Sequence, residues 1–155
     1  MTTTLSERAV PAARFAGLRA NSFAAIIALL VEFCLGIWVN LYGHLPAADH
    51  GANVGTGFSR AISGGPVGLS IHAVVGALIV ISSVTATVRA VLVRRPVVLV
   101  PAVLGLLAVV DAAVSGATFV GNGSNAASMS MAVATAVAVA CYAFLLLISG
   151  QRQAD

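Results

Sequence analysis

Two carboxylates, Glu32 and Asp111, lie in the middle of long apolar stretches, whereas every other charged residue lies outside such stretches. A charge at the centre of a bilayer costs at least about 2.5–3.5 kcal/mol, so such residues usually face the interior of a helix bundle. At a rise of about 1.5 Å per residue, Glu32 lies about 15 Å below Tyr42 and Asp111 about 13 Å below Val120. Both acids are therefore predicted near the midplane and inside the bundle. They would carry protons, orient a ligand, or hydrogen-bond a neighbouring helix as protonated acids.

His72 is the third candidate for chemistry, about five residues into the second apolar stretch. Residues Gly76, Ser83 and Thr87 share its helical face at i+4, i+11 and i+15, which predicts that His72 points inward, as a functional group or as a hydrogen-bonded structural residue. No basic residue shares the depth of the two acids, so neither is predicted to have an ion-pair partner. A metal site is not predicted, because one intramembrane histidine cannot form one.

Further polar and thioether side chains are expected around these three residues. An outer layer at about the depth of His72 is predicted to contain Asn40, Ser115 or Thr118, and Met129 or Met131. Thr135 is predicted at the level of the acids. The predicted site is thus a polar layer near one membrane face with two carboxylates below it.

The composition indicates that these residues lie in helices that span a lipid bilayer. The chain has 155 residues, of which 59% are hydrophobic and only 8% charged, against roughly 25% charged in a soluble domain. Four windows reach the length of about 20 apolar residues that a span needs: about 23–42, 67–88, 97–120 and 126–148. Short connections favour antiparallel neighbours. The prediction is an all-α, up-down-up-down four-helix transmembrane bundle that forms a single domain over residues 1–155.

Arginine placement predicts the orientation of the bundle, because positive flanks stay in the cytoplasm. Seven of the eight basic residues flank the predicted cytoplasmic side, and Arg60 alone lies in the first outer loop, residues 43–66. Both termini are therefore predicted to be cytoplasmic, with residues 1–22 as a cytoplasmic segment of a multi-pass plasma-membrane protein. Glu32 and the length of the first apolar stretch argue against a cleaved signal peptide. The arginines form no basic patch, so nucleic acid is not an expected partner.

A weak internal repeat relates the two halves of the chain. Glu32 precedes Gly36 in the first rising span, and Asp111 precedes Ser115 and Gly116 in the second. The descending spans that follow begin with His72 and with Met129 and Met131. Two half-bundles related by an axis along the membrane normal would produce this pattern, and so would independent use of glycine in packed helices.

Several short motifs resemble one four-helix half of the haem A synthase family. The resemblance covers roughly residues 30–147 and is carried by residues 39–46 (VNLYGHLP), 69–78 (LSIHAVVGAL), 94–96 (RRP) and 114–121 (VSGATFVG). In that family each half holds a haem between a histidine at the start of its second helix and another at the start of its fourth. The resemblance implies that His72 is the first ligand and that Met131 replaces the second, since methionine can ligate haem beside histidine. The family's eight-helix length and paired-cysteine loop are absent, so haem A synthesis itself is not expected.

The sequence leaves three functions in competition. The first is a non-catalytic accessory or assembly subunit, either a homo-oligomer or part of a larger membrane complex. The small size of the chain, the helix faces rich in small residues and the absence of catalytic motifs from the sequence favour it. The second is a b-type haem-binding redox protein that uses His72 and Met131. The third is a proton-coupled transport module that uses Glu32 and Asp111. All three have the lipid bilayer as their surroundings.

Overall fold

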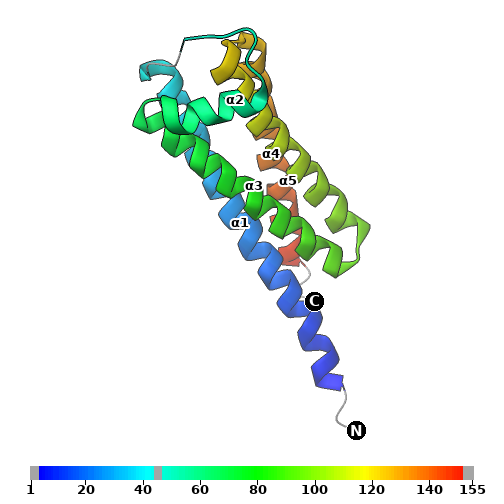
Figure 1. Cartoon of the computed structure of the whole chain (residues 1–155). Coiled ribbons are helices and arrows are strands. Elements are labelled where there is room, and N and C mark those ends of the chain that lie inside the picture. Colours follow the sequence, from blue (N-terminus) through cyan, green and yellow to red (C-terminus); the bar gives the residue numbers. More distant parts are fainter. Residues whose placement is uncertain (1–3, 44–46, 152–155) are drawn as a thin grey trace.

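Helices make up most of the chain (Figure 1). The computed structural model describes the backbone of residues 4–43 and 47–151 and the side chains of residues 14–43 and 47–150. Its elements are α1 (Thr4–Tyr42), α2 (Val54–Ser59), the π-helix η1 (Arg60–Gly64), α3 (Val67–Val93), α4 (Pro96–Asn122) and α5 (Asn125–Gln151). The predicted helical class is therefore confirmed for the described residues.

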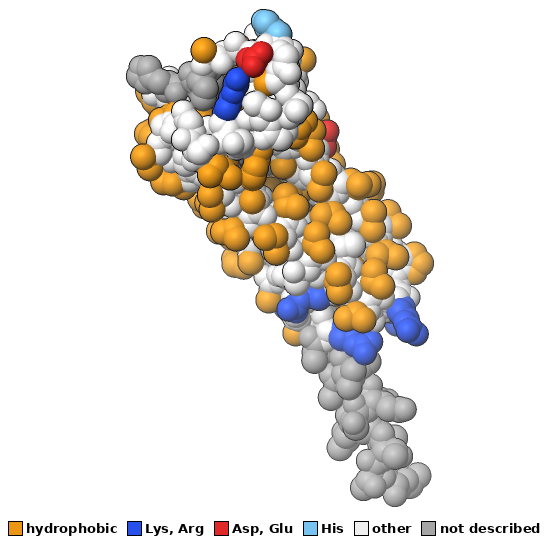
Figure 2. Space-filling view, viewed as in Figure 1, with side chains coloured by type: hydrophobic (Ala, Val, Ile, Leu, Met, Phe, Trp, Pro, Cys, Tyr) orange, Lys and Arg blue, Asp and Glu red, His pale blue; other side chains and the backbone are white. Residues whose placement is uncertain are grey.

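Four of these helices are long and apolar enough to cross a membrane, as predicted. The candidate spans are Arg14–Tyr42, Val67–Val93, Pro96–Asn122 and Asn125–Gly150. Helices are the expected form, because a bilayer offers the backbone no water to bond and a helix satisfies its own amides. Large apolar side chains cover the outside of the bundle over most of its length (Figure 2). Such a surface suits lipid.

Interhelical contacts fix the register and show that sequence neighbours run antiparallel. Between α1 and α3, Arg14 Nη1 donates to the Leu92 carbonyl at 2.9 Å and Asn21 Nδ2 to the Ser82 carbonyl at 3.3 Å. Thr87 Oγ1 donates to the Ala102 carbonyl at 3.2 Å and joins α3 to α4. The main helix contacts then continue from α4 to α5 and from α5 back to α1. The four helices therefore form a ring in which α3 lies diagonally across from α5.

Tight turns close two of the connections between long helices. Arg94, at φ 55°, and Arg95 separate α3 from α4, which begins at Pro96. Proline suits a first helical position because its missing N–H would have no partner there. At the other end of α4, Gly123 adopts φ 72° and its N–H donates to the Phe119 carbonyl at 2.8 Å. Glycine adopts this left-handed conformation without the steric cost that a Cβ brings.

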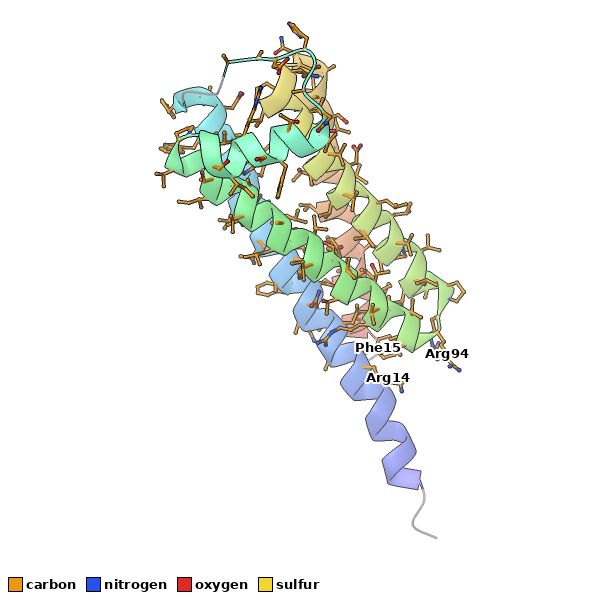
Figure 3. All side chains as sticks on the ribbon, in the orientation of Figure 1. Arg14, Phe15 and Arg94 are labelled. Carbon is orange, nitrogen blue, oxygen red and sulfur yellow. The ribbon has the colours of Figure 1, made fainter. Side chains whose placement is uncertain are left out.

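Five arginines gather at one end of the bundle, which we call the basic end: Arg14, Arg19, Arg89, Arg94 and Arg95. Figure 3 shows Arg14 and Phe15 of α1 at the same end as Arg94 of the α3–α4 turn. Helix α1 continues beyond this end (Figure 1), so residues 4–22 extend the first span as one helix and do not form a separate segment. The side chain of Arg8 and residue Arg152, both used to predict orientation, lie outside the described residues.

The opposite end, which we call the capped end, is covered by residues 47–64. This segment was predicted as part of a long loop, but it contains α2 and η1. Asn53 caps α2 by accepting from Thr56 N at 2.9 Å, as short polar side chains do at helix N-termini. Ser70 Oγ donates to the Ile62 carbonyl at 2.8 Å and joins the cap to α3. The glycine-rich composition concealed these short helices, which depend on tertiary contacts.

Gly57 is the position where the cap approaches α4 most closely. An added Cβ there would overlap the carbonyl oxygen of Ala117, whereas one at Gly64, in the same cap, would meet nothing within 4 Å. We expect Gly57→Ala to lower the free energy of unfolding by about 1–3 kcal/mol, the usual cost of overpacking, and Gly64→Ala to change it little. Denaturant titration in detergent measures both. Equal effects of the two substitutions would contradict the close approach of α2 to α4.

Candidate functional site

An ion pair between α1 and α3 lies inside the bundle. Glu32 Oε1 lies 2.8 Å from His72 Nδ1, and the two side chains are only 12% and 19% exposed. The two atoms are within ion-pair distance but lack hydrogen-bond alignment, and Glu32 Oε2 has no hydrogen-bond partner among the described residues. The pair therefore retains an unused acceptor, Glu32 Oε2.

This pairing corrects the prediction that Glu32 has no partner at its own depth. The depth of Glu32 was counted from the end of the first span and that of His72 from the start of the second. This assumed that the two helix ends lie at the same level. The register places Gly68 against the ring of Trp38, however. Helix α3 therefore begins about one turn below the end of α1, and His72 lies level with Glu32.

Two glycines make room for the pair. A Cβ at Gly36 would lie 3.0 Å from His72 Cε1, and a Cβ at Gly76 would lie 3.1 Å from Glu32 Oε1. Gly36 is one turn above Glu32 on α1, and Gly76 is one turn below His72 on α3. Each helix thus places a glycine against the functional side chain of the other. Small residues at such positions let membrane helices approach closely.

The pair borders a cavity of about 410 Å³ in the capped half of the bundle. All four long helices and the cap contribute to its wall, which is mostly apolar and contains many alanines and glycines. On α1, α3 and α4, the lining residues nearest the basic end are Leu29, Ile81 and Val109. Glu32 and His72 are the only titratable residues among those that line it. The cavity therefore combines an apolar interior with one carboxyl–imidazole pair.

Met131 lies on the α5 side of the same cavity, diagonally across the ring from α3. A Cβ at Gly116 of α4 would lie 3.1 Å from Met131 Sδ. Gly36 and His72 on α1 and α3 thus have counterparts in Gly116 and Met131 on α4 and α5. The structure brings the two predicted ligand residues to one cavity, and each packs against a glycine of the preceding long helix. Met129, the alternative, is 67% exposed.

Asp111 does not join this site, and the prediction that both acids face the interior is wrong for it. Its side chain is exposed on α4, where Ser130 Oγ donates to Asp111 Oδ2 at 3.3 Å. Glu32 precedes Gly36 by four residues, but Asp111 precedes Gly116 by five. Ala112 occupies the equivalent position and lines the cavity. One residue rotates a side chain by about 100° around a helix, which turns Asp111 outward.

The predicted polar layer is divided in the structure. Asn40 is exposed and also lines the cavity, so it lies where the cavity meets the surface. Thr135 lines the cavity too, with its hydroxyl donating to the Met131 carbonyl at 2.8 Å. Ser115 is buried, 8% exposed, but is not among the cavity residues. The glycines opposite His72 and Met131 were interpreted as packing residues, and no spacing in the sequence pairs them with these side chains.

No protein-family model matches the chain, and neither does any curated protein or solved structure. The similarity to haem A synthases therefore stays a prediction, and the function is inferred from the geometry of the cavity.

Proposed function

We propose that the protein binds haem b in the cavity of its capped half, where His72 and Met131 would hold the iron. The observation that carries this proposal is that both side chains line one apolar cavity from diagonally opposite helices. Histidine with methionine is an established ligand pair for haem iron in electron-transfer proteins. One-electron transfer is the chemistry that haem supplies.

The Glu32–His72 pair supports a ligand role for the histidine. Metal-binding histidines almost always use the second ring nitrogen to contact a carboxylate, carbonyl or water, which orients the ring and raises its basicity. His72 Nδ1 lies 2.8 Å from Glu32 Oε1, which brings a carboxylate to the second ring nitrogen, although the two atoms are not aligned as a hydrogen bond. It leaves Nε2 as the nitrogen that would bind iron.

The volume and lining of the cavity also suit an apolar group. Its volume of about 410 Å³ lies within the range of about 300–1,000 Å³ typical of ligand and cofactor sites. Gly36 and Gly116 leave the walls beside both ligands without a side chain. Asn40 offers a polar contact near the surface, where the propionates of a haem would lie.

The other two hypotheses receive less support from particular contacts. The hypothesis of a proton-coupled transporter uses two interior acids, but one of them, Asp111, is exposed. An accessory subunit in a homo-oligomer or larger complex would use the exposed apolar faces, but lipid can cover those faces equally well. We place the basic end on the cytoplasmic side of the plasma membrane, since arginine-rich flanks stay inside, and the capped half and its cavity toward the outside.

Titration with haemin tests the proposal. The wild-type protein, purified in detergent, is expected to give a Soret band and, once reduced, an α-band, whereas His72→Ala loses both because the iron loses its histidine ligand. His50→Ala is the matched control, since His50 is exposed in the cap segment and its loss should leave the spectrum unchanged. A wild-type protein that takes up no haemin, or a His72→Ala variant that binds it equally, contradicts the proposal.

A further inference from the structure

A groove runs along the outside of the bundle between α1 and α5, near the basic end. It has a volume of about 840 Å³ and shares no lining residue with the cavity that holds Glu32 and His72. Its α1 side consists of Ala16, Arg19, Ala20 and Phe23, and its α5 side of Leu146, Leu147 and Gly150. The α1 residues follow one another at i, i+3, i+4 and i+7, so they share one face of the helix. The groove is therefore formed where the first and the last long helix meet.

Small residues keep this groove open, and large apolar side chains border it. A Cβ added at Gly150 would meet nothing within 4 Å, and Ala16 and Ala20 bring only one methyl group each. Phe23 and Leu147 stand beside them, 56% and 66% exposed. The space is many times the roughly 30 Å³ that one water molecule takes up in the liquid. It therefore suits a long apolar group better than a single ion or water.

The arginines of the basic end divide between two sides of α1. Arg14 Nη1 donates to the Leu92 carbonyl of α3 at 2.9 Å. An added Cβ at Gly17 would overlap the guanidinium of Arg89, which therefore reaches from α3 across α1. Arg19 instead lines the groove on the α5 side and is the one charged residue that does so. The groove thus has a single cation of its own.

The charge around this cation is positive throughout the part of the chain that the structure describes. The carboxylates in that part are Glu32, Asp49 and Asp111, and they lie in the middle of the bundle or toward the capped end. Figure 2 shows the arginines gathered at the basic end, below the apolar surface. An anion bound at Arg19 is therefore attracted by the neighbouring arginines and meets no described carboxylate.

The groove lies at the level where the hydrocarbon of a bilayer meets its headgroups. About 20 residues of helix, or about 30 Å, cross the hydrocarbon, and counted back from Tyr42, where α1 ends, they reach Phe23. Arg19 lies one turn beyond Phe23, which is about 6 Å. Arg19 is therefore at the level of the headgroups, and Phe23 is at the edge of the hydrocarbon. A molecule with an anionic head and apolar chains would match both levels of the groove.

We infer that the groove between α1 and α5 binds an anionic phospholipid, with the phosphate on Arg19 and an acyl chain along Phe23 and Leu147. Guanidinium groups bind phosphate through two parallel hydrogen bonds, and basic pockets between transmembrane helices bind anionic headgroups. A water-soluble anion would leave the apolar walls uncovered, and a lipid without net charge would gain less from the arginines. The lipid bridges α1 and α5, the contact that closes the ring of helices. Haem plays no part in this site.

Native mass spectrometry of the protein in detergent tests the charge preference. The probes are phosphatidylglycerol and phosphatidylcholine with the same acyl chains. The wild type should bind phosphatidylglycerol at least about fivefold more tightly, the effect of one arginine near an anionic lipid, and Arg19→Ala should lose most of this preference. Arg95→Ala is the matched control, since it removes the same charge in the α3–α4 turn, on the opposite edge of the ring. Equal affinities of the wild type for the two lipids, or equal losses in the two variants, overturn the inference.

Gly150→Leu tests the groove without removing a charge. A Cβ at Gly150 meets nothing within 4 Å, so leucine should leave the helix packing intact and fill the space that the acyl chain needs. Phosphatidylglycerol should bind several-fold more weakly to this variant than to Ala24→Leu, the matched control, which is exposed on α1 outside the groove. Glycerol phosphate, which has the headgroup chemistry without acyl chains, should not displace the lipid from the wild type. Equal binding to the two variants, or displacement by glycerol phosphate at equal concentration, overturns the inference.

Discussion

His72→Leu is expected to destabilise the bundle strongly, by about 3–5 kcal/mol in the free energy of unfolding. The substitution leaves Glu32 buried without its partner, and breaking a buried ion pair by removing one member costs about that much. Both side chains are less than a fifth exposed, so solvent can screen little of the lost interaction. Unfolding of the purified protein by a denaturing detergent measures the change.

The double variant His72→Leu/Glu32→Leu should recover most of this stability. Replacing a whole buried ion pair with apolar residues of similar volume is often neutral or stabilising, and leucines suit the apolar wall of the cavity. The free-energy change of the double variant should therefore be well below the sum of the two single changes. Additive effects would show that Glu32 and His72 do not interact.

Asp111→Leu is the matched control for these variants. It removes the other intramembrane acid, but from an exposed position on α4, where leucine meets lipid or detergent. Its loss should leave the free energy of unfolding unchanged or raise it. A large loss of stability would mean that Asp111 has a buried partner and would favour an arrangement with two interior acids.

Met131→Leu is expected to keep haem bound and to lower its reduction potential. The thioether is the ligand that raises the potential of a haem held by histidine, and leucine keeps the volume of the side chain while removing the sulfur. Axial ligands set haem potentials over a range of about 0.8 V, so a spectroelectrochemical titration resolves the loss. The oxidised spectrum should also change, since the iron loses its sixth ligand.

Met129→Leu provides the comparison, because Met129 lies two residues away on α5 but is 67% exposed. Its spectrum and potential should equal those of the wild type. If Met129→Leu shifts the potential and Met131→Leu does not, the ligand assignment is wrong although haem binding still holds. If neither shifts it, the sixth ligand comes from elsewhere.

The sequence alone determined the helical class, the four apolar helices and the turns between the last three. These follow from strong local rules: a bilayer requires the backbone to satisfy its own hydrogen bonds, and arginines, prolines and glycines mark where a span ends. His72 and Met131 were selected as ligand candidates only through the resemblance to one half of the haem A synthase family. Such features depend on short segments of chain and need no knowledge of how the helices pack.

Only the tertiary structure decided which side chains meet. A helix that is apolar on every face gives no periodic signal for its inner side, so the sequence could not distinguish the inward Glu32 from the outward Asp111. In each rising helix, the glycine that packs against the neighbouring helix sets which side chains face inward. Glu32 lies four residues before Gly36, but Asp111 lies five residues before Gly116, and this difference of one residue turns Asp111 outward. The register of α1 on α3 likewise depends on a tertiary contact, that of Gly68 with Trp38. Glu32 and His72 pair because helix packing, over residues far apart in the chain, brings them to one level.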